Sequence, residues 1–297
     1  MSAGAPAGAE LRVPTPLETF DLAMGDGAVI RIRRHGRVDG VRLFISNGNG
    51  FATDGYYPFW GPLAERFDLI VFDFRNHGQN PRASSGRDGH TYAQMALDLE
   101  RVFRDVEKRL GPKPSVGVFH SMSARTAMKH AIEIGFRWAA LILFDPPNVP
   151  PPGHRVYDVM DVFERRLADW AMQRQERFTD PSDLAGQYAE TRAHRTWVPG
   201  AFELACAREL EASIYLQAMT MNLWPPPEDY GGPVKLIAAD PKGRGAVASA
   251  IANQALAEDF GYTYEAIPDT GHMLQIQKPE ECRRSMLAFL DECGIGC

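Results

Sequence analysis

Long apolar runs are absent from this 297-residue sequence. No stretch approaches the about 20 consecutive apolar residues that a helix needs to cross a bilayer, so we expect no membrane span. The first 16 residues also lack the basic flank and apolar core of a signal peptide. We interpret residues 1–16 as a disordered lead-in.

An excess of basic residues is lacking as well. Asp and Glu number 38 against 32 Lys and Arg, which gives a formal net charge of -6. Because no global positive field attracts phosphates, we expect no nucleic-acid partner. Hydrophobic residues make up 44% of the chain and charged residues 24%, which is typical of a globular domain with a sizeable core.

Cysteine is scarce. The four cysteines are Cys206, Cys282, Cys293 and Cys297, and their spacing matches no metal-ligand motif. The sequence therefore predicts no metal, reduced thiols and a cytoplasmic protein. A disulfide between Cys293 and Cys297 is the less favoured alternative. The oligomeric state stays open, a homo-oligomer included.

Short apolar runs alternate with helical patterns along most of the chain. A hairpin at residues 19–34 opens the chain, and helices are expected at 91–109, with Thr91 as N-cap, and at 122–135, 245–261 and 278–292. Continuous apolar runs predict buried strands at 41–46, 69–74, 115–120, 139–144, 234–239 and 262–267. This alternation predicts an α/β fold with a mostly parallel, twisted sheet covered by helices on both faces.

One long stretch interrupts the alternation. Residues 146–232 contain no good candidate for a buried strand, and proline clusters bracket them. Helical patterns occur there at 156–178, 181–195 and 201–219. We therefore predict a helical cap at 146–232, inserted into a core domain formed by 17–145 and 233–297.

The segment VGVFHSMSARTAM, residues 116–128, predicts a strand, a sharp turn and a helix, with Ser121 in the turn. This is the context of a nucleophile elbow, whose usual pattern is G-x-S-x-G. Phe119 and Ser123 stand where the two glycines are expected. Ser121 is thus a candidate nucleophile, and the competing interpretation is a serine that only caps the helix.

A serine nucleophile needs a base and an acid that orients the base. His272, in the segment PDTGHMLQIQKPEE, follows the last predicted strand and is the best-placed histidine. Asp240 and Asp145 each end a predicted strand, and both fit the chain order of serine, acid and histidine. We favour Asp240 as the acid and keep Asp145 as the alternative.

Backbone N–H groups must stabilise the oxyanion in such chemistry. The residue after the nucleophile, Met122, is expected to supply one of them. The loop NGNGF, which follows the strand at 41–46, is expected to supply the other, at Phe51. No cofactor is required for this reaction.

Together these segments resemble the α/β-hydrolase superfamily, in its serine-nucleophile, lipase- and esterase-like branch with a helical cap. NGNGFATDGYYPFW resembles the oxyanion loop, FDFRNHGQNP the D-x-R-G-H-G-x-S segment, HSMSA the elbow, and TGHMLQIQKPEE the histidine-bearing end. The resemblance implies hydrolysis of a small-molecule ester or related acyl bond. Asn76 and Asn80 depart from the second motif, and Lys242 stands where many relatives carry the acid. Asp73 matches a structural aspartate, to which we give no catalytic role.

Two other interpretations remain open from the sequence. The same three residues would support hydrolysis of a C–C bond or acyl transfer, and the altered elbow motivates a catalytically silent scaffold that binds a ligand. Substrate choice is expected to depend on the cap and the loops, because the sheet is mostly core. The predicted cap is rich in arginine, and one or two of these arginines could hold a substrate carboxylate.

Overall fold

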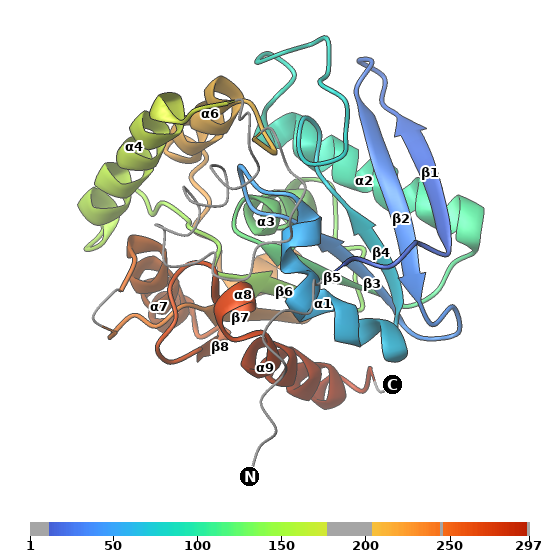
Figure 1. Cartoon of the computed structure of the whole chain (residues 1–297). Helices are drawn as coiled ribbons and strands as arrows, with labels where there is room; N and C mark the ends of the chain where they lie inside the picture. Colours follow the sequence, from blue (N-terminus) through green and yellow to red (C-terminus); the bar gives the residue numbers. More distant parts are fainter. Residues whose placement is uncertain (1–11, 177–203, 244–245, 296–297) are drawn as a thin grey trace.

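The computed structural model describes residues 12–176, 204–243 and 246–295 (Figure 1). Its centre is one sheet of eight strands in the order β1-β2-β4-β3-β5-β6-β7-β8. The strands are β1 (Glu18–Ala23), β2 (Val29–Gly36), β3 (Arg42–Ser46), β4 (Asp68–Phe72), β5 (Ser115–His120), β6 (Ala140–Phe144), β7 (Val234–Ala238) and β8 (Thr263–Ala266). Strand β2 is antiparallel to its neighbours β1 and β4, and all other pairs are parallel. The predicted fold class is therefore confirmed.

Alternate residues of each central strand face opposite helical layers. Phe44 of β3 joins a core cluster with α2 (Tyr92–Leu110), α3 (Met122–Glu133) and Leu256 of α7 (Ala248–Phe260). Its neighbours Leu43 and Ile45 join a second cluster with α1 (Tyr57–Trp60), α8 (Leu274–Gln277) and α9 (Pro279–Glu292). Strands β3 to β7 are buried along their whole length, which explains their continuous apolar sequences.

Helix α2 begins and ends where its sequence indicates. Thr91, the predicted N-cap, accepts a hydrogen bond from Gln94 N–H at 3.1 Å. Gly111 ends the helix with φ at 83°, a conformation that side chains rarely adopt. Short 3-10 helices complete the connections: η1 (Thr53–Tyr56) and η2 (Gly61–Glu65) around α1, and η3 (Pro227–Tyr230) before β7.

Helices α4 (Tyr157–Gln173) and α6 (Arg208–Ala218) lie between β6 and β7 in the chain. They pack on each other through Ala168 and Ala171 of α4 and Ala212 and Tyr215 of α6, and they lie together at the upper left of Figure 1. Two of the three helices predicted for the cap are thus present, while the one predicted at 181–195 falls outside the described residues. The division into core and cap remains a prediction.

The parallel strands bring four chain segments to one edge of the sheet. Strands β5, β6, β7 and β8 are neighbours and run in the same direction, so their carboxyl ends meet there. Ser121 and Asp145 follow these ends directly, Asp240 comes two residues after β7, and the loop after β8 leads to His272. Among the described helices, none is both long and apolar enough to cross a membrane.

Candidate active site

Ser121 lies in a strained turn between β5 and α3. Its φ of 54° and ψ of -114° are unusual for a residue with a side chain. It occupies the N-cap position of α3, but its side chain makes no capping hydrogen bond. Instead Oγ lies 2.9 Å from Nε2 of His272. The interpretation of Ser121 as a simple helix cap therefore does not fit this geometry.

His272 is held between Ser121 and a carboxylate. Its Nδ1 lies 2.6 Å from Oδ2 of Asp145, which is fully buried. A carboxylate only accepts, so Nδ1 carries the proton and donates it to Asp145. Nε2 is then free to accept the hydrogen bond from the Ser121 hydroxyl. The His272 side chain keeps 25% of its surface exposed, which leaves the base open on one side.

Asp145 is surrounded by donors. Oδ1 accepts from Ala239 N–H at 3.1 Å and from Asn253 Nδ2 at 3.0 Å, and Oδ2 accepts from Ser249 Oγ at 2.7 Å as well as from His272. Burial works to raise the pKa of Asp145, but the hydrogen bonds, led by that of His272, hold it below its usual value. Asp145 therefore stays ionised beside His272. Ser249 and Asn253, both on α7, were not singled out from the sequence.

The preference for Asp240 over Asp145 is not supported by the geometry. Asp240 accepts hydrogen bonds from Lys242 N–H at 2.8 Å and from Asp269 N–H at 2.9 Å. Its carboxylate thus closes the turn after β7 and braces the loop that leads to His272. Asp240 is only half-buried, whereas Asp145, which follows the adjacent strand β6 with φ at 43°, is fully buried and contacts His272.

The geometry does not favour Phe51, the predicted oxyanion donor, either. Phe51 N–H already donates to Gly48 C=O at 3.3 Å inside a turn. The loop comes closest to Ser121 at Gly48, three residues before Phe51, because a Cβ added to Gly48 would lie 3.2 Å from the Ser121 Cβ. Asn49 N–H makes no hydrogen bond within the described residues, and neither does Met122 N–H, which begins helix α3. Asn49 and Met122 are therefore the candidate donors.

The two residues that replace the elbow glycines are both accommodated. Phe119 is buried, and its ring packs edge-on against Trp138 at 5.5 Å between centroids. Gly117 makes room for that ring, since a Cβ there would lie 2.7 Å from Phe119 Cε2. Ser123 Oγ accepts from His120 N–H at 2.9 Å and lies 2.9 Å from the His120 carbonyl oxygen. Neither substitution displaces Ser121 from His272.

A second histidine supports the loop of the first. His120 Nδ1 lies 2.8 Å from the Tyr56 hydroxyl, and its Nε2 lies 2.9 Å from the carbonyl oxygen of His272. Burial lowers the pKa of His120 to about 3, so its ring is neutral at pH 7. Nε2 then donates to His272 and Nδ1 accepts from Tyr56, whose oxygen in turn accepts from Gly48 N–H at 3.1 Å. This chain of hydrogen bonds links the His272 loop to the loop after β3, which contains the candidate donor Asn49.

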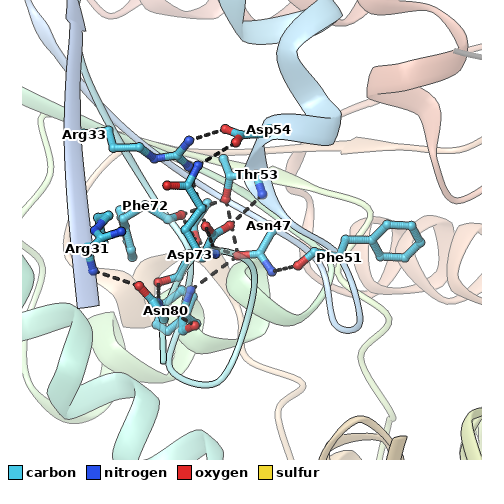
Figure 2. A network of polar contacts seen from close by, with 12 residues as sticks. Arg31, Arg33, Asn47, Phe51, Thr53, Asp54, Phe72, Asp73 and Asn80 are labelled. Atoms are coloured by element: carbon cyan, nitrogen blue, oxygen red, sulfur yellow. Dashed lines mark hydrogen bonds and ion pairs between the residues drawn. The ribbon is translucent and has the colours of Figure 1, made fainter. Parts of the chain in front are cut away.

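Figure 2 shows the network of polar contacts that fixes the other end of the loop after β3. The buried Asp73 accepts from Thr53 N–H at 2.6 Å and forms an ion pair with Arg33 at 3.5 Å. Asn47 Nδ2 donates to the Phe51 carbonyl oxygen at 2.7 Å. These contacts hold the loop against β4, which agrees with a structural part for Asp73.

One cluster has the residue types of a metal site. The ligand atoms of His77, His90 and Cys206 lie within 4.8 Å of one another, and all three residues are buried. The surroundings disfavour a cation, because burial lowers the pKa of His90 to about 2 and the guanidinium groups of Arg75 and Arg82 act in the same direction. Burial also raises the pKa of the Cys206 thiol. We assign no metal to this cluster. Within the described residues Cys206, Cys282 and Cys293 are free thiols, and Cys297 lies outside them.

Comparisons with known proteins agree with this architecture. The model of the alpha/beta hydrolase family matches residues 43–284. A search of curated proteins found no significant match. Among solved structures, a hydrolase from Pseudomonas aeruginosa PA01 superposes with a TM-score of 0.67 at 18% identity, covering 92% of this chain and 98% of its own.

Two further structures are similar to this chain. A thermophilic esterase from Thermogutta terrifontis has a TM-score of 0.66 at 17% identity and covers 93% of this chain and 99% of its own. E-2-(acetamidomethylene)succinate hydrolase has a TM-score of 0.66 at 19% identity, with coverages of 92% and 99%. At these identities the likeness establishes the fold alone. The family model spans most of the chain and supports a hydrolase, and the chain belongs to the alpha/beta hydrolase family.

Proposed function

We propose that this protein is a serine hydrolase that cleaves small-molecule carboxylic esters or related acyl bonds through an acyl-enzyme on Ser121. The observation that carries the proposal is the alignment of three side chains. Ser121 Oγ lies 2.9 Å from His272 Nε2, and His272 Nδ1 lies 2.6 Å from the buried carboxylate of Asp145. In this arrangement Ser121 is the nucleophile, His272 the base and Asp145 the acid that orients the base.

In the acylation step, Ser121 Oγ attacks the carbonyl carbon while His272 Nε2 takes the hydroxyl proton. The carbonyl π electrons move to the oxygen, which the N–H groups of Met122 and Asn49 stabilise. When the tetrahedral intermediate collapses, the bond to the leaving group breaks and His272 gives it the proton. A water then attacks the acyl carbon and loses a proton to His272; as this second intermediate collapses, the bond to Ser121 Oγ breaks, His272 returns the proton to Oγ, and the acid leaves. Asp145 stays ionised and stabilises the imidazolium.

Labelling with a fluorophosphonate tests this proposal. We expect an adduct on Ser121, located by mass spectrometry, in the wild type and in a Ser84→Ala control, because Ser84 is exposed in a loop outside the site. The Ser121→Ala variant should fold, lose the adduct and lose ester turnover by as much as about 10⁶-fold in kcat. An active Ser121→Ala variant, or folded wild type without any adduct, would contradict the proposal.

The silent-scaffold alternative loses its main support in this geometry. It was motivated by the missing elbow glycines, but Gly117 makes room for Phe119, and Ser123 hydrogen-bonds to the His120 backbone. Hydrolysis of a C–C bond or acyl transfer uses the same three residues, so the site does not separate these reactions from ester hydrolysis. Product analysis with water, alcohol and peroxide as acceptors would separate them.

A further inference from the structure

A buried ion pair lies beside the candidate nucleophile. Arg125 is 2% exposed and Glu164 is fully buried, and the two side chains are hydrogen-bonded through Arg125 Nη2 and Glu164 Oε1. Arg125 belongs to α3 and Glu164 to α4, so the pair joins the helix of Ser121 to the helix that follows β6. Burying two charges costs most of what their attraction returns, so stability alone does not explain such a pair.

The position of Arg125 places this pair near the reacting atoms. Arg125 comes four residues after Ser121, which is one helical turn, and helical side chains lean toward the N-terminus. The Arg125 guanidinium is fixed by a second hydrogen bond, from Nη1 to the Tyr92 hydroxyl at 3.2 Å. Burial raises the pKa of the Glu164 carboxyl, and Arg125 and, more weakly, the nearby His272 act in the opposite direction.

One oxygen of Glu164 has no donor. Oε1 is held by Arg125, but Oε2 is buried and has no hydrogen-bond partner among the described residues. Buried carboxylate oxygens normally accept hydrogen bonds, and an unsatisfied one needs a specific explanation. Nearby Glu211, by contrast, pairs with Arg174 at 2.6 Å through one oxygen and lies 3.5 Å from the Tyr215 hydroxyl through the other.

We propose that Glu164 is a substrate-binding residue whose Oε2 accepts a hydrogen bond from an N–H or O–H group of the substrate, while Arg125 holds Oε1. This inference rests on the proposed function and narrows its substrate class. The substrate is then a polar acyl compound that bears a hydroxyl or an amide N–H near the scissile bond, rather than a plain alkyl ester. A site that pairs a buried acceptor with a substrate donor rejects analogues without that donor.

Two pairs of matched esters test the inference on the full chain. In the first pair, p-nitrophenyl 3-hydroxybutyrate differs from p-nitrophenyl butyrate by one hydroxyl. In the second, the p-nitrophenyl ester of N-acetyl-β-alanine differs from that of 5-oxohexanoic acid by N–H in place of CH2. We expect the wild type to prefer the donor-bearing ester of at least one pair by about 10–100-fold in kcat/KM.

Glu164→Gln puts an amide in place of the carboxylate and should bring that preference to near one. The matched control is Glu133→Gln, at an exposed position of α3, which should keep the wild-type preference. If Glu164→Gln does not fold, Glu164→Asp withdraws the oxygen by one methylene and should also reduce the preference. An unchanged preference in a folded Glu164 variant would overturn the inference.

The outcomes also separate this inference from the proposed function. If folded wild type hydrolyses none of the four esters and takes no fluorophosphonate label, the proposed function fails. If it hydrolyses both members of each pair equally well, the hydrolase proposal stands, and only the proposed role of Glu164 in substrate binding is overturned. That result is expected if a bound water, and not the substrate, donates to Oε2.

Discussion

Asp145 and His272 are 127 positions apart in the sequence but in contact in the fold. The Asp145 carboxylate accepts four hydrogen bonds, one of them from His272. Such a carboxylate fixes the tautomer of the histidine as well as its orientation. Asp240 does neither, because its carboxylate accepts its hydrogen bonds from backbone N–H groups of turns. The two aspartates therefore have separable effects on activity.

We predict that Asp145→Asn lowers kcat by about 10⁴-fold, because an amide at this position can donate to Nδ1 and so favours the wrong tautomer of His272. Asp240→Asn should change kcat far less and act mainly on the loop around Asp269. Steady-state kinetics on both variants, with circular dichroism to check folding, would measure this difference. A larger loss in Asp240→Asn than in Asp145→Asn would contradict the assignment of the acid.

Local sequence patterns selected Ser121 and His272, whose side chains the structure places 2.9 Å apart, but did not distinguish between the two candidate acids. A strand, a sharp turn and a helix surround Ser121, and the last loop before the final helix contains His272, so local patterns identify both. Asp145 and Asp240 instead end adjacent parallel strands and look alike in sequence. Their difference lies in the tertiary contacts that each carboxylate makes, which the local sequence does not contain. The choice of Phe51 as oxyanion donor had the same cause. The sequence does not show that Phe51 N–H donates to the Gly48 carbonyl inside a turn.

At the scale of elements, strand β5 shows how an elbow is built without its usual glycines. Residues 117 and 119 lie on the same face of the strand, so the missing side chain of Gly117 provides the space for the ring of Phe119. Ser123 supplies hydrogen bonds at the start of α3. The G-x-S-x-G pattern covers only two residues on either side of Ser121. It therefore does not include Gly117, which provides the space for Phe119.

We predict that Gly117→Ala lowers the free energy of unfolding by about 1–3 kcal/mol, because the new methyl group would overlap Phe119 and Leu141. Phe119→Leu in the same chain should recover part of this loss, since the smaller side chain frees the space above residue 117. Urea unfolding of the two single variants and the double variant gives the coupling energy. Additive losses would show that Phe119 does not depend on Gly117.

At the scale of the whole molecule, the sheet was predictable because its central strands are buried on both faces. Each then appears as a continuous apolar run, and the runs alternate with helices. The contacts between α4 and the core were not predictable in the same way. Arg125 and Glu164 are 39 positions apart and polar, so neither periodicity nor hydrophobicity indicates that they meet.

The chain also carries buried histidines whose protonation is coupled to folding. Burial lowers the pKa of His35 to about 4 and that of His90 to about 2. In the unfolded chain both have their ordinary pKa near 6.5. Below that pH the unfolded state binds protons that the folded state does not, so each histidine stabilises the fold fully above about pH 6.5 and progressively less as the pH falls.

We predict that each of these histidines lowers the free energy of unfolding by about 1–2 kcal/mol between pH 7 and pH 5. Buried carboxyls with raised pKa values, such as Asp73, act in the opposite direction, so the total pH dependence does not isolate the histidines. The variants His35→Gln and His90→Gln do, because the change between the two pH values cancels any loss of packing that is independent of pH. Each variant should lose about 1–2 kcal/mol less than the wild type on acidification, and the double variant about twice that difference. Urea unfolding at both pH values measures it, and a variant whose loss equals that of the wild type would mean that the histidine it replaces is protonated in the folded protein.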